Sequence, residues 1–318
     1  MASAVVILLA TVGASWASYH FLEKKINFSP LNFQPQNMAV LTLTLVVPVA
    51  AVFGWHYGSN QYQNFLLSAQ LVTAIPGDIG QEEYREVVSA RSVECVNSEI
   101  RESSLWCRQS SGNAPVEIAI IGDSHAEHLL FGLSAAKPGT EIAYYARTEL
   151  PVPGSSSEMA KILGHVVESQ SIRIVILSVF WLHRGVPATE MVEVVETLQS
   201  AGKSVFLTND VPYFAGRDVA ACRVSAAINA PRRCDFEPFG PDQTASLNET
   251  LRAITSATGA TFVDTYGLFC QDRKCSMSGR LSDQLPEALF FRDESHLNSL
   301  GSIFVGRELA RYLLPTGR

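Results

Sequence analysis

The chain contains 318 residues, of which 47% are hydrophobic and 17% are charged, and its formal net charge is −7 at pH 7. Soluble domains average about 25% charged residues, so this composition is too apolar for a disordered chain. The net negative charge opposes binding to nucleic acids and other polyphosphates, and no nucleic-acid partner is expected. The length allows roughly two domains, or one large domain with a further segment.

Two apolar stretches lie near the N-terminus, at residues 4–22 and 38–57, and neither contains Asp, Glu, Lys or Arg. Each has about 20 residues, enough for a helix to cross the ~30 Å hydrocarbon core of a bilayer. Lys24 and Lys25 lie between them, and the positive-inside rule places that short loop in the cytoplasm. We therefore expect two transmembrane helices in residues 1–57, with the N-terminus and the rest of the chain outside the cytoplasm. In a Gram-negative bacterial cell this means an inner-membrane location with the rest of the chain in the periplasm. A signal peptide, for which the first residues lack a basic side chain, and a buried helical hairpin are the alternatives.

The rest of the chain changes character twice. Residues 58–115 are mixed and polar, and we expect a linker or lead-in there, with helices around residues 59–72 and 80–92. From there onward short apolar runs alternate with helical stretches. The expected strands are residues 116–121, 141–146, 172–180, 204–209 and 261–264. The expected helices are residues 125–136, 156–169, 188–201, 243–258 and 299–313.

This alternation predicts an α/β domain over residues 116–318, with a parallel sheet covered by helices on both faces. In such folds the functional groups gather at the carboxyl ends of the strands. Residues 213–241 interrupt the alternation and are expected to form an inserted loop.

Six cysteines follow the apolar stretches and fall into three pairs that are close in the sequence. They are Cys95 and Cys107, Cys222 and Cys234, and Cys270 and Cys275. Cysteines on the exported side of a membrane are typical of disulfides, and pairing each with its neighbour would close three short loops. The sequence alone does not choose among the possible pairings, and free buried thiols or a metal site are the alternatives. No Cys-x-x-Cys motif supports the metal.

Two short motifs carry chemistry. The first is Gly-Asp-Ser-His at residues 122–125, where a strand turns into a helix and exposes the Ser124 hydroxyl near backbone amides. The second is Asp-Glu-Ser-His at residues 293–296, just before the last expected helix. A serine hydroxyl is a weak nucleophile at neutral pH and needs a base that a third group orients. We expect His296 to be that base and Asp293 to orient it.

The order of these motifs resembles the SGNH (GDSL-like) hydrolase superfamily over about residues 116–314. The sequence Ser-Tyr-His-Phe-Leu-Glu-Lys at residues 18–24 resembles the signature that ends the membrane domain of acyltransferase family 3 proteins, which O-acylate cell-surface glycans. The chain therefore resembles the C-terminal part of such a membrane O-acyltransferase, fused to a periplasmic SGNH domain. This resemblance implies a three-layer α/β/α, flavodoxin-like domain, preceded by the last helix of the membrane domain and one extra span. It also implies a catalytic triad of Ser124, Asp293 and His296.

The pattern departs from the superfamily at the oxyanion hole. Its members usually build the hole from the serine amide, a glycine after the second strand and an asparagine after the third. Here the nearest glycine after the second strand is Gly154, and Trp181 takes the place of the asparagine. The expected hole therefore contains the Ser124 amide and Gly154, while His125 and Trp181 are candidates to line the acceptor site. A zinc site on His125 and His128 lacks a third ligand, so no metal is expected.

Three functions remain open. The first is an acyltransferase in which Ser124 accepts an acyl group, expected to be acetyl, and passes it to a cell-surface polysaccharide such as O-antigen. The second is a periplasmic acetyl-esterase that uses the same triad with water as the acceptor. The third is a catalytically idle SGNH fold that positions the glycan, which the missing asparagine would favour. The resemblance implies no cofactor in this chain; the acyl donor, expected to be acetyl-CoA, is used by the membrane part. The expected partners are that membrane acyltransferase domain, as a preceding part of the protein or as a separate chain, the glycan acceptor and the lipid bilayer.

Overall fold

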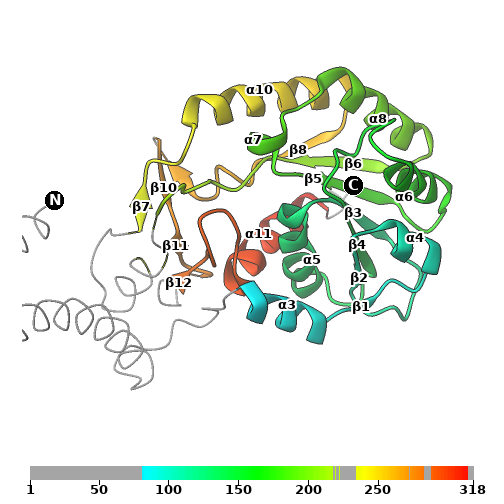
Figure 1. Ribbon diagram of the computed structural model, residues 1–318, viewed down its shortest axis with the longest axis horizontal. Helices are drawn as coiled ribbons and strands as arrows, with labels where there is room; N and C mark the ends of the chain where they lie inside the picture. Colours follow the sequence, from blue (N-terminus) through cyan, green and yellow to red (C-terminus); the bar gives the residue numbers. More distant parts are fainter. Residues whose placement is uncertain are drawn as a thin grey trace, which may run out of the picture. The chain divides into compact units, whose positions relative to one another are not determined.

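The computed structural model describes residues 81–313, except for residues 218, 220–221, 223–233, 272 and 283–287 (Figure 1). The two apolar stretches and the helix expected at residues 59–72 lie outside this part and remain predictions. Within the described part, no helix combines the length and the apolar character that crossing a bilayer requires.

The described residues fold around a seven-stranded sheet with the strand order β1-β2-β4-β3-β5-β6-β8. The strands from β4 to β8 in this order run parallel, whereas β2 pairs antiparallel with β4 and β1 pairs antiparallel with β2. The strands are β1 (Val93–Glu94), β2 (Trp106–Gln109), β3 (Ile118–Gly122), β4 (Ile142–Ala146), β5 (Ile174–Ser178), β6 (Ser204–Thr208) and β8 (Thr261–Val263).

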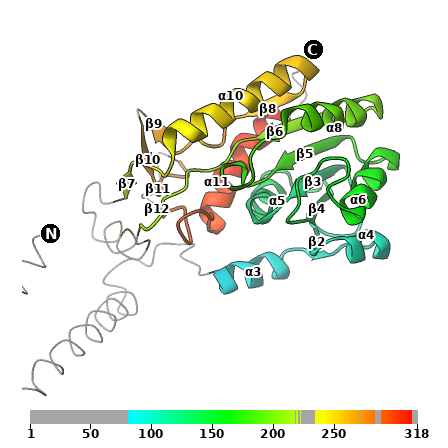
Figure 2. The same ribbon diagram turned by 45° about the horizontal axis from the view of Figure 1, so that its top comes forward.

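Helices cover both faces of this sheet and give the three layers that the sequence predicts (Figure 2). One face carries α3 (Gln81–Ala90), α5 (Ser124–Ala136) and α11 (Ser299–Tyr312). The other carries α4 (Ser98–Ser103), α6 (Ser157–Glu168), α8 (Ala188–Ser200) and α10 (Pro241–Thr258). In β3, Ile118 and Ile120 enter the first core while Ala119 and Ile121 enter the second. A continuous apolar run is needed in such a strand because both of its faces are buried.

The five strands and five helices expected after residue 116 are all present within about two residues, but the sheet extends further than expected. Residues 93–109, which the sequence pattern places in a lead-in, form its antiparallel edge. The domain therefore begins before residue 116, and the sheet is mixed rather than wholly parallel. These two strands are short and partly polar, so they carry no periodic apolar signal. β2 is held by pairing with β4, and β1 by pairing with β2.

All six cysteines are disulfide-bonded, and each pairs with its neighbour in the sequence. The nearest-neighbour pairing is thus confirmed, and free thiols or a cysteine metal site are excluded. The first bond joins the end of β1 to β2, and the last joins β9 (Cys270–Gln271) to β10 (Lys274–Ser276). A small sheet, β7-β10-β9, and a two-stranded sheet, β11-β12, lie beside the main domain. Their remaining strands are β7 (Asp235–Phe236), β11 (Ser278–Gly279) and β12 (Ala288–Leu289).

The two helices that flank the expected active site touch through their backbones. A Cβ atom on Gly132 of α5 would lie 1.7 Å from the carbonyl oxygen of Ser302 in α11, and one on Gly306 would lie 2.1 Å from the carbonyl carbon of Gly132. Only glycine fits at either position, because real Cβ contacts almost never fall below 3.0 Å. This close contact fixes the beginning of α5 relative to the segment that precedes α11.

Candidate active site

Ser124 is the first residue of α5, directly after β3. The preceding Asp123 caps the helix, since its Oδ1 accepts a hydrogen bond from the amide of His125 at 3.0 Å. Gly122 allows β3 to pass close to β5, because a Cβ there would lie 1.6 Å from the carbonyl oxygen of Ser178. The Ser124 hydroxyl therefore stands at the carboxyl edge of the sheet, beside amides that a helix start leaves without intrahelical partners.

Three side chains meet in the order expected of a nucleophile, a base and an orienting carboxylate. The Oγ of Ser124 lies 2.9 Å from Nε2 of His296. The Nδ1 of His296 lies 2.9 Å from Oδ2 and 3.0 Å from Oδ1 of Asp293. When Nδ1–H donates to the carboxylate, Nε2 is left as an acceptor for the serine proton.

Asp293 is held as an anion in this arrangement. Burial raises its pKa, but the hydrogen bond and charge of His296, together with the amides of Ser295 and His296, outweigh burial and bring the pKa to about 2. Its Oδ1 accepts from those two amides at 2.9 and 2.8 Å. The loop is tied to α11 by Asn298, whose Oδ1 accepts from the amides of Leu300 and Gly301 while its Nδ2 donates to the backbone of Leu289. Because only a few residues separate Asp293 from the Asn298 cap of α11, the His296 imidazole between them is held in place.

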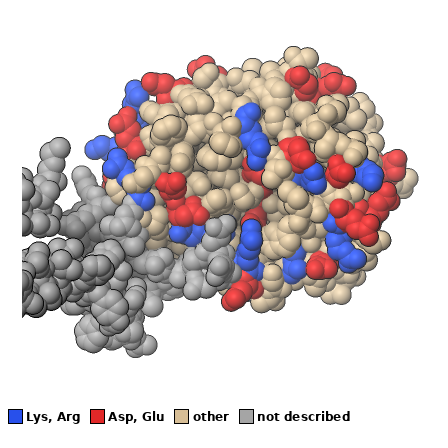
Figure 3. Space-filling model, in the orientation of Figure 1, with Lys and Arg blue, Asp and Glu red and all other residues tan. Residues whose placement is uncertain are grey.

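A pocket of about 500 Å³ opens in front of Ser124 and His296. This volume lies within the usual range of about 300–1,000 Å³ for small-molecule sites. Aromatic and basic side chains dominate the rest of its lining: Trp106, Tyr144, Phe180, His183, Arg85, Arg147 and Arg184. On the described part of the face drawn in Figure 3, by contrast, basic and acidic side chains alternate and form no continuous basic surface.

A buried polar cluster lies behind the imidazole of the triad. The rings of His125 and His128 have their centroids 5.1 and 5.5 Å from it. Burial lowers the pKa of both histidines well below the usual value, so they are neutral. The Arg292 guanidinium stacks 4.0 Å from the Tyr84 ring and lies 3.9 Å from Glu127. Burial raises the pKa of Glu127, and Arg292 opposes that rise.

The sequence pattern did not reveal this cluster, although two signals were visible. Glu127 is an acidic residue just before the apolar run at residues 129–133 of α5, three positions after Ser124, and Arg292 directly precedes Asp293. Both side chains are almost fully buried. Charged residues are rarely buried unless they are paired, and here each neutralises the other beside the triad.

Two of the other expected site residues are placed differently. Trp181 is fully buried, its Nε1 donates to the carbonyl of Thr208, and it does not line the pocket. Its assignment to the acceptor site is therefore wrong, and Phe180 lines the pocket instead. Gly154 is not among the lining residues, where Ala146, Arg147 and Thr148 represent the segment after β4. The structure thus gives no support to Gly154 as an oxyanion donor.

His125 does line the pocket, as expected for an acceptor-site candidate, but only 6% of it is exposed. It lies with its ring stacked on Phe180 at a centroid distance of 4.1 Å, so it supports the pocket wall. Among the described residues, no group of histidine, cysteine and carboxylate side chains could hold a metal ion.

The polar pair after β6 has a structural role. Asn209 accepts from the amides of Thr265 and Tyr266, and Asp210 accepts from the amides of Trp181 and Leu182 at 2.8 and 2.7 Å. Asp210 thereby caps the short helix α7 (Trp181–Arg184). Burial raises the pKa of Asp210 to about 8, although the two amides oppose this.

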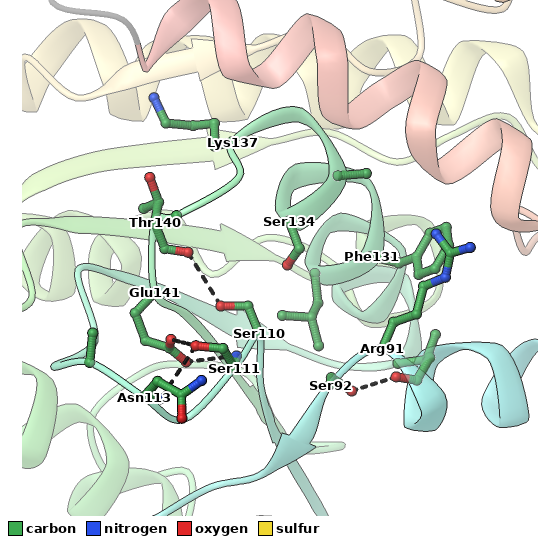
Figure 4. Close-up of a pocket in the computed structure, with 15 residues that line it drawn as sticks. Arg91, Ser92, Ser110, Ser111, Asn113, Phe131, Ser134, Lys137, Thr140 and Glu141 are labelled. Atoms are coloured by element: carbon green, nitrogen blue, oxygen red, sulfur yellow. Dashed lines mark hydrogen bonds between the residues drawn. The ribbon is translucent and has the colours of Figure 1, made fainter.

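A second cavity, of about 460 Å³, lies at the opposite, amino edge of the sheet (Figure 4). Ser134 at the end of α5 points into it, and Arg91 and Lys137 flank it just after the ends of α3 and α5. Cationic side chains are favoured at helix C-termini, so the positions of Arg91 and Lys137 are explained by the helices and do not indicate a bound ligand. The carboxylate of Glu141 is occupied by the amide and hydroxyl of Ser111. Because no histidine lies among its described lining residues, this cavity does not repeat the Ser–His arrangement.

The sequence and the fold were compared with known proteins. The model of a family of SGNH domains, described as fused to AT3 domains, matches residues 94–311. No protein with a curated description matches the sequence. Among solved structures, the periplasmic domain of a lipopolysaccharide acetyltransferase from Salmonella ser. Paratyphi A superimposes with a TM-score of 0.54 at 15% identity, covering 74% of this chain and 96% of that one.

Two further structures resemble the chain more weakly. A carbohydrate acetylesterase from Sinorhizobium meliloti gives a TM-score of 0.38 at 10% identity, covering 62% of this chain and 98% of that one. The aryl esterase of M. smegmatis gives 0.39 at 10% identity, with coverage of 62% and 98%. At 15% identity, the likeness to the Salmonella domain shows a shared fold only. The family match extends over more than half of the chain. The chain therefore belongs to the family of SGNH domains that are fused to AT3 domains, and it is an enzyme of the serine-nucleophile acyltransferase and esterase type.

Proposed function

We propose that this domain is an O-acyltransferase that carries an acetyl group on Ser124 and passes it to a hydroxyl of a cell-surface polysaccharide such as O-antigen. The observation that carries the proposal is the hydrogen-bonded arrangement of Ser124, His296 and Asp293 in front of an open pocket. The family's fusion to AT3 domains and the acetyltransferase from Salmonella with the same fold support acetyl transfer.

In the first half-reaction, Oγ of Ser124 attacks the acyl carbonyl carbon while its proton moves to Nε2 of His296. The leaving group departs with that proton, and the acyl group remains bound to Oγ. Asp293 stabilises the imidazolium that forms in between, because its low pKa keeps it ionised at neutral pH. In the second half-reaction, His296 takes the proton of the acceptor hydroxyl as the acceptor oxygen attacks the acyl carbonyl carbon. The bond from that carbon to Oγ of Ser124 then breaks, and His296 returns the proton to Oγ.

The developing oxyanion needs a second donor other than Gly154. The amide of Phe180 donates to Oδ2 of Asp123, so it is already occupied. We assign the first donor to the Ser124 amide and the second to Arg184, which lines the same pocket and has its Nε 3.5 Å from Oδ2 of Asp123. Losing one such donor lowers kcat by about 10²–10³. Arg184→Gln should therefore lose activity in this range, whereas Arg184→Lys should retain part of it.

The source of the acyl group follows from the resemblance at the N-terminus. An acetyl-CoA-dependent membrane acyltransferase domain would supply it, with this domain on the periplasmic side of the bacterial inner membrane. The apolar stretches at residues 4–22 and 38–57 support such an anchor by their length and lack of charge.

Hydrolysis is the second candidate function. About 19% of the His296 side chain and 36% of the Asp293 side chain are exposed, so water can reach the triad. With water as the acceptor, the same acyl-serine would be cleaved and the enzyme would be an acetyl-esterase. Ester turnover measured with and without polysaccharide separates the two functions: a transferase moves acetyl onto the glycan, whereas an esterase releases acetate at the same rate in both cases.

The test of the proposal compares Ser124→Ala with Ser134→Ala, a serine at the other end of the same helix. The full-length protein is expressed with its membrane acyltransferase part, and polysaccharide acetylation is measured by NMR. We expect Ser124→Ala to abolish acetylation and Ser134→Ala to retain it. Unchanged acetylation in Ser124→Ala would exclude an acyl-serine. A fluorophosphonate probe tests the third candidate function. If the probe fails to label Ser124 in the wild type, an idle domain that positions the glycan is favoured.

A further inference from the structure

A row of aromatic side chains leads away from the nucleophile pocket, and we call it the aromatic strip: Phe180, His183, Tyr213 and Phe239. His183 stacks on Phe180 with a centroid distance of 6.0 Å, and Tyr213 meets Phe180 edge-on at 5.7 Å. Phe239 in turn contacts Tyr213 at 5.4 Å. The strip begins inside the pocket, since Phe180 and His183 line it, and ends outside it.

The strip is assembled from three separate segments that are held in place. Its residues lie at the start of α7, in the loop after β6 and just before α10, and α7 contacts α10 (Figures 1 and 2). The amide of Phe239 donates to the carbonyl of Tyr213 at 2.7 Å. The hydroxyl of Tyr213 donates to Glu294, and the carbonyl of Glu294 accepts from the amide of Phe214. Because Glu294 is adjacent to Asp293, the strip is fixed relative to the triad.

The surface of the strip combines rings with polar groups. Phe239 is 53% exposed, His183 is exposed, and Phe180 and Tyr213 are half-buried. The Tyr213 hydroxyl, the Glu294 carboxylate and the His183 imidazole lie along it. A sugar ring has one face of C–H groups and a rim of hydroxyls, which matches an aromatic surface with hydrogen-bonding groups beside it.

We propose that Tyr213 and Phe239 form a second saccharide subsite, which binds a sugar unit of the acceptor next to the one that is acylated. This inference rests on the proposed transferase function and adds that the acceptor is an oligosaccharide or a polysaccharide rather than a single sugar. A lipid surface fits less well, because the carboxylate of Glu294, which accepts from the Tyr213 hydroxyl beside the strip, would face anionic headgroups.

The test uses the full chain with p-nitrophenyl acetate as a soluble acyl donor. The acceptors are the purified surface polysaccharide of the source bacterium and its single repeating unit. Phe239→Ala should raise KM for the polysaccharide about tenfold, as expected for one lost aromatic contact, without changing kcat. KM for the single unit and the rate of fluorophosphonate labelling should stay at wild-type values. Phe239→Tyr should restore the wild-type KM, because it keeps the ring.

Tyr312→Ala is the matched control, since Tyr312 is 50% exposed at the end of α11 and outside the strip. If the wild type acetylates the polysaccharide and Phe239→Ala has an unchanged KM, the subsite is refuted while the transferase function stands. If Phe239→Ala is impaired in phosphatidylethanolamine–phosphatidylglycerol vesicles but not in detergent, the strip contacts lipid and the subsite is also refuted. If the wild type transfers no acetyl to either acceptor, the transferase function itself fails.

Discussion

Gly132→Ala should disrupt the active site from a distance. The added Cβ would lie 1.7 Å from the Ser302 carbonyl oxygen, against a practical minimum of 3.0 Å, so α5 and α11 must separate by about 1.3 Å. Overpacking of this kind typically costs about 1–3 kcal/mol of stability. Because Ser124 begins α5 and His296 lies just before α11, the separation also stretches their 2.9 Å hydrogen bond. A displacement of about 1 Å can lower a rate by about 10²-fold.

Two assays measure these effects: urea unfolding for stability, and p-nitrophenyl acetate turnover with fluorophosphonate labelling for the site. Gly164→Ala is the control, because Gly164 lies in α6 and an added Cβ would meet nothing within 4 Å. Alanine is a better helix former than glycine by about 1 kcal/mol, so this variant should be at least as stable as the wild type and fully active. A stable Gly132→Ala with wild-type turnover would show that the contact between the two helices does not position the triad.

Three further changes test other parts of the structure. Asp293→Asn should lower ester turnover by about 10⁴-fold, as loss of the orienting carboxylate does in serine proteases; a loss below tenfold would contradict its role. The folded-state pKa of Asp293, about 2, lies below its ordinary 3.8, so its carboxylate stabilises the fold above about pH 4 and this gain is lost as the pH falls toward 2. Urea unfolding at several acidic pH values should show a smaller decline in Asp293→Asn than in the wild type, and equal declines would argue against an ionised Asp293 carboxylate in the folded domain. Asp210→Asn places an amide NH₂ against a backbone N–H of α7 and should destabilise the domain by about 1–3 kcal/mol. An unfolding midpoint equal to that of the wild type would contradict this role of Asp210. The double variant Cys95→Ser with Cys107→Ser should lose about 2–4 kcal/mol of stability. Dithiothreitol should lower its melting temperature less than that of the wild type, because the variant retains two of the three disulfides. An unchanged stability would mean that strand pairing alone holds the edge strands.

The parallel part of the fold could be predicted because its signals are local. A strand such as β3 is buried on both faces and must be continuously apolar, and helices between such strands require crossovers. The edge strands β1 and β2 carry no such signal. Their conformation depends on the pairing of β2 with β4, on the pairing of β1 with β2 and on the Cys95–Cys107 disulfide, which a linear pattern does not reveal.

The triad could be predicted for a similar reason. Asp293 and His296 share one turn, and Ser124 follows the strand that the topology places beside them. The pocket wall could not be predicted, since it depends on which side chain after β5 faces the pocket and which one packs into the core. Phe180 faces the pocket, while Trp181 turns into the core toward Thr208. The buried ion pair of Glu127 and Arg292 likewise joins two segments far apart in the sequence.

The most direct test is to trap the acyl group on the nucleophile. The full chain is mixed with p-nitrophenyl acetate, quenched in acid and digested, and its peptides are measured by mass spectrometry. We predict an acetyl group on the peptide that contains Ser124, its absence in Ser124→Ala, and a lower yield when polysaccharide is present to accept it. An unmodified Ser124 peptide, or the same acetylation in Ser124→Ala, would contradict an acyl-serine on this domain.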